Sequence, residues 1–260
     1  MNKTINFFNR NFKEMLRDPL IYVFCLGFPL VMFALFLIVN KYTGGNTPMF
    51  ELYALLPAII TFSYTFVMLT MALLVSKDRQ TFFLKRLYSS TMKASDFILG
   101  YAIAGICIGF AQTLVCFGSG IVFSLVYQLE FISLGQSLLL IVSQLPILLT
   151  NVFLGILFGT LFNDKSAPGI CSVFISASGI LGGCWMPVET MGDFETFCRC
   201  LPFYPSVYIG KVITQATNAF GKIYQFDSVA KLGLIPLVLC TAISIVLSFV
   251  VFKNKMISDN

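Results

Sequence analysis

The chain has 260 residues, of which 57% are hydrophobic and only 11% are charged. Soluble domains average about 25% charged residues, so this sequence has too little polar surface to cover a water-soluble globule of its size. Histidine is absent, and the formal net charge is +5. The composition excludes an ordinary soluble domain and chemistry that needs a histidine base. A single membrane domain covering residues 1–260 is the simplest organisation.

Six stretches lack Asp, Glu, Lys and Arg, and each is long enough to cross a membrane. A helix needs about 20 apolar residues to span the roughly 30 Å hydrocarbon layer. The pattern predicts an all-α integral membrane protein with six transmembrane helices. The predicted spans are Leu20–Asn40, Leu52–Ser76, Phe97–Leu129, Phe131–Asn163, Ser166–Val188 and Leu232–Phe252.

Residues 1–18 are predicted to form an amphipathic helix ahead of the first span. A basic helix in this position is typical of one lying in the cytoplasmic interface, as an anchor or as a partner contact. Asp18-Pro19 ends it, because a residue before proline is pushed out of the α region. The first span has full length and no small-residue cleavage site, so we expect it to be retained. The apolar stripe consists of Ile5, Phe8, Phe12, Met15 and Leu16.

Residues 76–96 form a basic loop after the second predicted span. Its centre, Phe82–Leu87, mixes aromatic, aliphatic and cationic residues on a predicted short helix. Exposed aromatic residues on the aqueous side indicate either a partner groove or the bilayer surface. Docking to a partner and binding to lipid headgroups are the two interpretations.

The predicted spans hold few groups that could carry chemistry or ions. Their deepest polar side chains include Gln112, Gln144 and Asn151, which we interpret as interhelical hydrogen-bonding groups. Ion-coupled carriers commonly use an ionisable residue within the membrane, so this pattern disfavours one. A stretch resembling a phosphate-binding loop, at residues 159–166, has Asp164 where a glycine is needed, and that carboxylate would repel phosphate.

Residues 189–231 form the longest segment between spans, and its pattern predicts two short amphipathic helices in the outer interface. Apolar residues share one helical face before Pro202, and others share a second face after Pro205. They are Met191, Phe194, Phe197, Cys198 and Leu201, then Val207, Tyr208, Val212 and Ile213.

The eight cysteines show no Cys-x-x-Cys pair, and no histidine accompanies them, so we expect no metal on this chain. Five lie within predicted spans and should behave as small hydrophobic residues. Cys184, Cys198 and Cys200 fall at or beyond the outer face, where Cys184 could pair with either of the others or all three could stay free.

Lysine and arginine are unevenly distributed between the two sides that six spans define. Twelve of the 17 basic residues fall on the side of both termini, and five fall on the other. The positive-inside rule therefore predicts cytoplasmic N- and C-termini in a cell-membrane protein. Topology explains the positive charge better than nucleic-acid binding does, so we expect no nucleic-acid partner.

Two motifs resemble the permease subunits of type-2 ABC transporters, the ABC-2 exporter family. The loop from Lys77 to Ser90 is similar to a family pattern of charged residues, a glycine and Arg-Leu, although Phe82 or Phe83 stands near the usual glycine. Residues 182–191 resemble the family's Gly-x-x-Pro-x-Glu segment, and Leu201-Pro202 follows as in the family. The resemblance covers nearly the whole chain.

The resemblance implies a coupling helix that docks into a separate cytoplasmic ATPase, with ATP and Mg bound by that subunit and no cofactor on this chain. Two copies, or this chain and a similar permease, would enclose a path between spans one, two and five, in contact with membrane lipid. The implied ATPase contacts are Asp78, Arg79, Phe82, Phe83, Leu84, Lys85, Arg86, Leu87, Asp164 and Lys165. The implied outer gate comprises Gly182, Gly183, Trp185, Met186, Pro187 and Glu189.

A stand-alone carrier or channel remains the alternative, and a membrane-embedded enzyme is disfavoured by the missing histidine and intramembrane carboxylates. The aromatic-rich spans favour efflux of a hydrophobic drug, peptide or lipid-like substrate. Phenylalanine facing lipid would give the same composition, so the substrate stays open.

Overall fold

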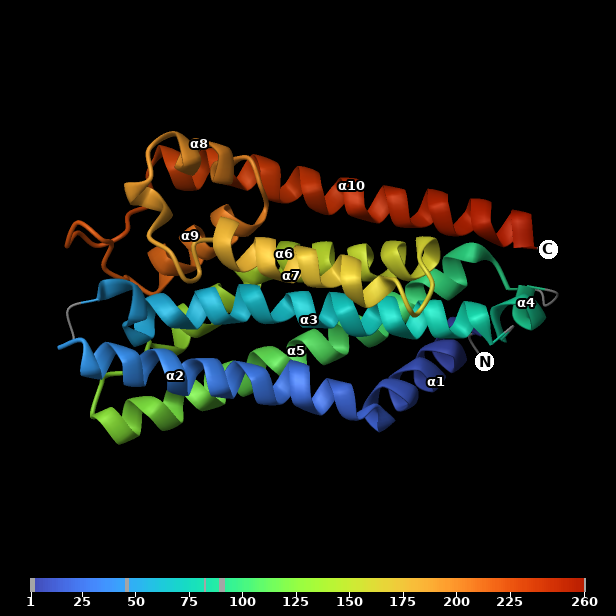
Figure 1. Ribbon diagram of the computed structural model, residues 1–260, viewed down its shortest axis with the longest axis horizontal. Helices are drawn as coiled ribbons and strands as arrows, with labels where there is room; N and C mark the ends of the chain where they lie inside the picture. The colour runs from blue at the N-terminus through green and yellow to red at the C-terminus, as the bar shows by residue number, and fades with distance from the viewer. Residues whose placement is uncertain (1–2, 45–46, 82, 89–91, 260) are drawn as a thin grey trace.

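The structure, a computed structural model, describes residues 3–44, 47–81, 83–88 and 92–259. These residues form an elongated bundle of long helices, which confirms the predicted all-α class (Figure 1). The elements in chain order are α1 (Lys3–Arg17), the π-helix η1 (Ile21–Gly27), α2 (Phe28–Tyr42), the 3-10 helix η2 (Pro48–Phe50), α3 (Leu52–Gln80), α4 (Phe83–Tyr88), α5 (Ala94–Tyr127), α6 (Leu134–Leu161), α7 (Ala167–Leu181), the 3-10 helix η3 (Val188–Thr190), α8 (Asp193–Arg199), α9 (Phe203–Ile213) and α10 (Ser228–Asp259).

The two ends of the bundle differ in what they contain. Both chain termini and α4 lie at one end, and α8 and α9 lie at the other (Figure 1). We call these the inner end and the outer end. The arrangement agrees with an even number of crossings, although the side of the membrane that each end faces stays a prediction.

Within the described residues, five helices are long and apolar enough to cross a membrane. They are Ile21–Tyr42, Leu52–Gln80, Ala94–Tyr127, Leu134–Leu161 and Ser228–Ile257. The predicted span Ser166–Val188 is instead the 15-residue helix α7, which ends at Leu181. Gly183 adopts a positive φ of 65° and turns the chain, so apolar composition alone overestimated the helix length. A sixth crossing stays a prediction.

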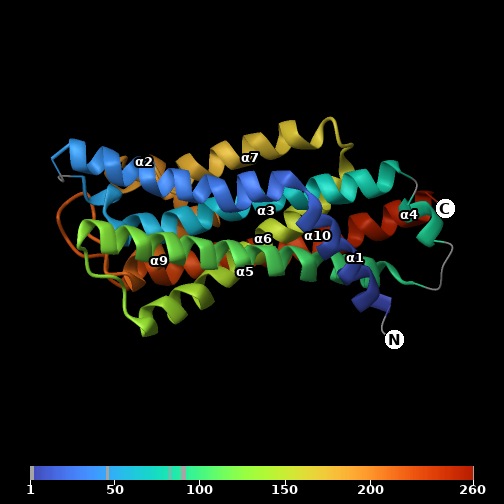
Figure 2. The ribbon, with the colours of Figure 1, turned by 90° about the horizontal axis from the view of Figure 1, so that it is seen from below.

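Helix α3 forms the centre of the bundle, with α5, α6 and α7 packed around it (Figure 2). The backbone of α6 approaches it closely at two glycines. A Cβ atom on Gly155 would lie 2.6 Å from the carbonyl oxygen of Met68, and one on Gly159 would lie 2.6 Å from that of Ala72. Small residues permit such contacts between membrane helices. The sequence of α6 therefore lets it bury one side of α3.

Polar side chains join helices in the middle of the bundle. Gln144 of α6 accepts hydrogen bonds from Thr61 of α3 at 2.8 Å and from Ser206 of α9 at 2.9 Å. Gln112 of α5 donates to the carbonyl of Ser63 at 2.9 Å. The predicted interhelical role is confirmed for both glutamines. Asn151 instead donates to Ile147 within its own helix.

Helix α1 is present, but its buried stripe differs from the predicted one. Phe7, Asn11 and Met15 face the bundle, whereas Ile5 and Leu16 are exposed. Phe7 fits against α5 because Gly100 has no side chain there; a Cβ atom would lie 2.5 Å from the Phe7 ring. The sequence pattern showed an apolar face of α1 but could not show which groove accepts it.

The two short outer helices appear where they were predicted, as α8 and α9. Helix α9 buries most of its residues against α3, α6 and α10. The buried face of α8 differs from the predicted apolar face, since Phe197 is 57% exposed and Cys198 is the buried residue of that helix. Helix α8 therefore leaves an aromatic surface uncovered at the outer end.

Candidate functional site

The short helix α4 lies at the inner end of the bundle (Figure 1) and packs against it through its apolar residues. Leu84 is fully buried in the main core, and Phe83 and Leu87 pack against it. The guanidinium of Arg10 lies 4.2 Å from the centre of the Phe83 ring, a cation–π contact with α1. Helix α4 is therefore joined to α1 as well as to the core. Phe82 and the side chains of Lys85 and Arg86 lie outside the described part of the chain.

Asp78, near the end of α3, is the centre of a buried polar cluster. Its side chain is only 2% exposed. Arg10 donates to both carboxylate oxygens, one of them at 2.7 Å, and the hydroxyl of Tyr101 donates at 2.6 Å. Burial opposes the charge of Arg10, but the hydrogen bonds and charge of Asp78 outweigh it and raise the Arg10 pKa. The cluster thus joins α1, α3 and α5.

Arg79 points in another direction from its neighbour Asp78. Its guanidinium donates to the carbonyl oxygens of Gly159 and Thr160 in the last turn of α6. Cations stabilise a helix C-terminus, where carbonyl groups lack partners within the helix. Arg79 therefore joins α3 to α6. Asp78 and Arg79, which were both predicted as ATPase contacts, thus bond other helices of this chain.

The loop between α6 and α7 contains the other predicted contacts, Asp164 and Lys165. Lys165 is exposed and Asp164 is half-buried. Asn163 accepts hydrogen bonds from Ser166 and shapes the turn before α7. The loop leaves a cation available to solvent beside the inner half of the bundle.

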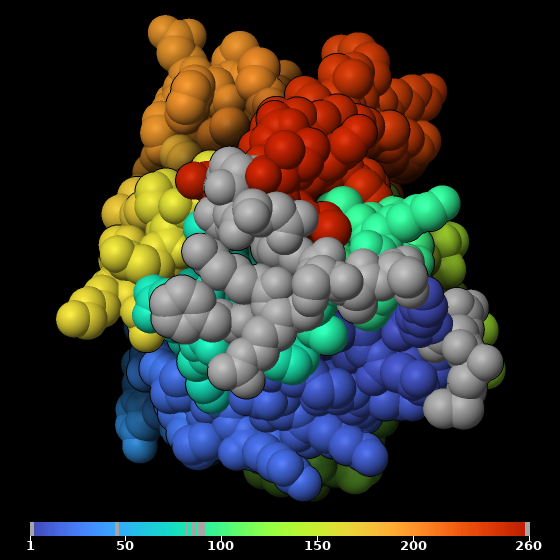
Figure 3. Space-filling model, turned by 90° about the vertical axis from the view of Figure 1, so that its right-hand side faces the viewer, coloured from blue at the N-terminus to red at the C-terminus, as the bar shows by residue number. Residues whose placement is uncertain are grey.

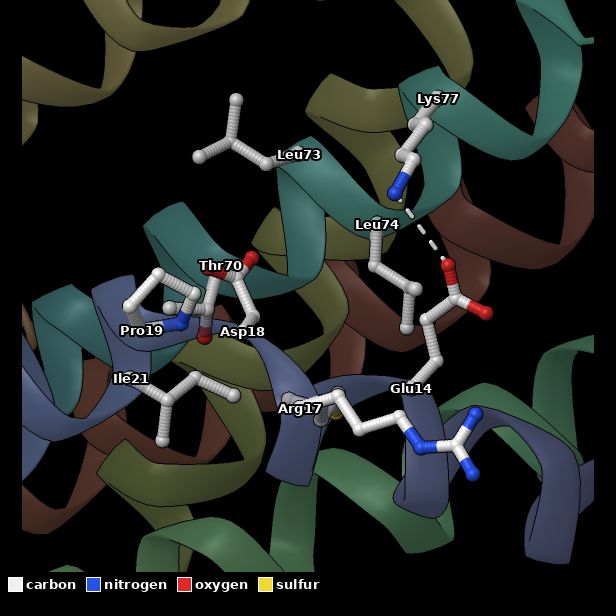
Figure 4. A pocket seen from close by; sticks show the side chains of 10 residues that line it. Glu14, Arg17, Asp18, Pro19, Ile21, Thr70, Leu73, Leu74 and Lys77 are labelled. Atoms are coloured by element: carbon white, nitrogen blue, oxygen red, sulfur yellow. Dashed lines mark hydrogen bonds and ion pairs between the residues drawn. The ribbon is translucent and has the colours of Figure 1, made fainter.

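A cavity of about 360 Å³ lies between α1 and the inner half of α3 (Figure 4). Lys77 and Glu14 form an ion pair of 3.3 Å beside it, joining the two helices. Asp18 accepts a hydrogen bond from the backbone of Leu20 at 2.9 Å, and the π-helix η1 begins at Ile21 in the cavity wall. π-helical turns are frequent at functional sites. The cavity therefore lies between two helices that the Glu14–Lys77 ion pair joins.

The predicted outer gate begins where α7 ends, at Gly182 and Gly183. Trp185 folds back from this turn into an aromatic cluster. Its ring stacks on Phe36 of α2 with centroids 4.6 Å apart and meets Phe62 of α3 edge-on at 5.0 Å. A Cβ atom on Gly179 would lie 2.6 Å from the indole nitrogen. Trp185 therefore connects α7 with α2 and α3.

Charged groups from α9 and η3 meet behind this turn. Glu189 accepts hydrogen bonds from the Tyr224 hydroxyl at 2.6 Å and from the Ala219 backbone at 3.3 Å. Lys211 is 4% exposed and donates to the carbonyl of Gly183 at 3.4 Å. Burial lowers the pKa of Lys211, and the nearby Glu189 charge opposes that shift. The buried Lys211 therefore stabilises the turn at Gly183, within the predicted gate.

A second cavity, of about 240 Å³, lies among these groups. Aromatic and charged residues line it together, including Phe50, Trp185, Glu189, Lys211 and Tyr224. Pro187 also lines it, and Met186 beside it is half-buried. Of the six predicted gate residues, Trp185, Pro187 and Glu189 line this cavity.

All eight cysteines are free in the structure. Cys184 is buried with its sulfur 3.5 Å from the carbonyl of Ala58, Cys198 packs with Val188 and Tyr204, and Cys200 is exposed. The disulfide alternative is therefore absent here, because Cys184 and Cys198 are buried in separate clusters. Among the described residues, no group of three or more Cys, Asp or Glu side chains could hold a metal ion.

The sequence pattern missed several residues of these clusters. No individual role was predicted for Arg10, Tyr101 or Lys211, which lie in the predicted interfacial helix, the third predicted span and the outer segment. The sequence did contain one sign of the role of Lys211: this lysine interrupts an apolar helical pattern, two turns after Tyr204. Their roles depend on contacts between distant segments.

The arrangement defines a helical, multi-pass membrane protein with a polar cluster at one end and a small cavity at the other. The family model described as ABC-2 family transporter protein matches residues 40–251. The chain therefore belongs to the ABC-2 family of transporter proteins, and this membership implies an ABC ATPase as partner. A comparison with curated proteins finds no match.

Proposed function

We propose that the chain is the permease subunit of an ATP-driven exporter and that a separate cytoplasmic subunit binds and hydrolyses ATP with Mg. Membership of the ABC-2 family supports this assignment. The observation that carries it is the position of α4, a short helix at the inner end that contacts α1 through Phe83 and Arg10. The permease itself performs no covalent chemistry.

We propose six crossings, with α7 as the fifth and both termini in the cytoplasm. At 1.5 Å per residue, the 15 residues of α7 extend about 22 Å, less than the roughly 30 Å hydrocarbon layer. The turn at Gly183 and the Trp185 segment would complete this crossing. Irregular backbone is tolerated at membrane depth when protein surrounds it.

Coupling would start at α4 and reach the bundle through the Asp78 cluster. Phe82, Phe83, Lys85, Arg86 and Leu87 would contact the ATPase, with Asp164 and Lys165 forming a second contact. Leu84, Asp78 and Arg79 would act behind that surface, because Leu84 is fully buried and the two charged side chains bond other helices of this chain, whereas Phe83 and Leu87 are only partly buried. A displacement of α4 would move Arg10, and with it α1 and α3.

The translocation path would lie along α2, α3 and α7, facing a second copy or a similar permease. Helix α7 leaves an uncovered face with small residues, including Gly169, Ser172 and Ser176, which suits close helix contact. Residues 182–189 would open and close the outer end. The apolar surfaces of α2 support a hydrophobic drug, peptide or lipid-like substrate.

The docking assignment is tested by purifying the tagged chain from its native membrane and measuring co-purifying ATP hydrolysis. The double variant Phe82→Ala/Phe83→Ala should lose most of that activity, since it removes two adjacent aromatic rings from the predicted docking segment. The matched control is Phe194→Ala/Phe197→Ala, which removes two exposed rings at the outer end and should retain it. Retention of wild-type ATP hydrolysis by the first variant would refute the assignment.

A further inference from the structure

A long apolar groove lies at the inner end between the start of α5 and the last turns of α10. It has a volume of about 570 Å³, within the range of sites that bind small molecules. Its walls include Phe249, Val250, Met256 and Ile257. The first turn of α5 and the last turns of α10 lie next to each other in Figure 3. The groove therefore offers an apolar surface at the boundary between the spans and the inner end.

Two exposed lysines, Lys93 and Lys253, complete the lining of this groove. Asp96 accepts a hydrogen bond from Thr4 of α1 at 3.0 Å and from the Lys93 backbone at 2.9 Å, and its charge also interacts with that of Lys93. Both ammonium groups are nevertheless exposed, so together they can meet an anion at the edge of an apolar wall. A phosphate joined to an acyl chain matches that combination.

A second groove along α10 serves as an internal comparison. It lies at the outer end, measures about 450 Å³ and has Leu232, Ile235 and Leu239 in its walls. Its cation, Arg199, is paired with Glu195 at 2.9 Å. The two grooves are similar in apolar character but differ in charge: the inner one has two lysines, and the outer one has a neutralised arginine.

We propose that the inner groove binds one anionic glycerophospholipid, with an acyl chain against Phe249 and Val250 and the phosphate between Lys93 and Lys253. Basic pockets between membrane helices on the cytoplasmic side are suited to anionic headgroups. The lipid would bridge α5 and α10. Because Asp96 and Thr4 join the start of α5 to α1, it would also stabilise the helices that surround the coupling end.

Native mass spectrometry of the purified full chain tests this site. Phosphatidylglycerol should bind one molecule per chain more tightly than phosphatidylcholine with the same acyl chains. Each lysine near an anionic lipid contributes a factor of roughly five in affinity, so Lys93→Gln/Lys253→Gln should weaken phosphatidylglycerol binding roughly 25-fold. The control Lys222→Gln/Lys231→Gln removes two exposed lysines at the outer end and should leave it unchanged.

A second variant tests the apolar part without altering charge. Val250→Trp should fill the groove and reduce phosphatidylglycerol binding while keeping both lysines; Val250 is 49% exposed, so the larger ring can be accommodated on the helix surface. Free glycerol phosphate at the same concentration should not compete. Equal binding of the two lipids, unchanged affinity in the Lys93→Gln/Lys253→Gln variant, or competition by glycerol phosphate would overturn the proposal.

Discussion

The inner and outer ends of the bundle use charged residues in different ways. At the inner end, ion pairs and hydrogen bonds join separate helices: Arg10 and Asp78 are 68 residues apart, and Arg79 and Thr160 are 81 apart. At the outer end, the contacts of Glu189, Glu195 and Lys211 stay within residues 183–227. The inner end can therefore transmit movement between helices, whereas the outer end holds one segment in shape.

This difference fits the roles that we propose for the two ends. A coupling surface must pass a displacement of α4 to the whole bundle, and the Arg10 contacts with Phe83 and Asp78 provide that route. A gate must change its own shape without unfolding its neighbours. The Gly183 turn, held by Lys211 and flanked by the Trp185 ring, is a local unit of this kind.

The largest effect is expected at the inner end, for Asp78→Ala. Removing one partner of a buried ion pair costs about 3–5 kcal/mol, and the partial exposure of Arg10 reduces this to about 3 kcal/mol. For a chain of this size, the melting temperature in detergent should fall by roughly 10 °C. Asp193→Ala, at an exposed outer position, is the control and should change it little. Equal melting temperatures for the two variants would mean that the cluster does not hold the helices together.

A smaller, pH-dependent effect is expected at the outer end, for Lys211→Met. Burial lowers the pKa of Lys211 in the folded chain, so the unfolded chain binds more protons below the ordinary lysine pKa of about 10.4. Wild-type stability should therefore rise as the pH increases toward that value, and this rise should be reduced in the variant.

At neutral pH the Lys211→Met chain should be modestly less stable than the wild type, because it loses the hydrogen bond to Gly183 and leaves the Glu189 charge without its neighbouring cation. Melting temperatures measured across neutral to alkaline pH give the comparison, with the exposed Lys222→Met as control. A variant that keeps the full alkaline rise would show that Lys211 is not the titrating group.

The uncharged stretches predicted the long helices well, because a run of about 20 apolar residues without a charge matches the thickness of the hydrocarbon layer. They overestimated α7, where Gly182 and Gly183 end the helix within an apolar run. Composition cannot separate a helix from an apolar turn. The gate role of residues 182–189 stays a prediction, and the structure adds the contact of Trp185 with Phe36.

The charged clusters were less predictable because their partners are distant in sequence. Asp78 and Arg79 looked like solvated loop residues beside a predicted docking helix. In the structure they bond α1 and α6, since α3 continues to Gln80, beyond the predicted end at Ser76. Because α3 is four residues longer than predicted at this end, Asp78 and Arg79 form contacts within the chain.

The central claim, that Arg10 passes a displacement of α4 to α1 and α3, is tested through Trp185, which contacts Phe62 of α3 and is the only tryptophan of the chain. In the purified complex with its ATPase, adding ATP should shift the Trp185 emission, with a Trp185→Phe complex as the blank. Arg10→Gln should keep the ATPase bound but lose most of this shift. An unchanged shift in Arg10→Gln would contradict the account.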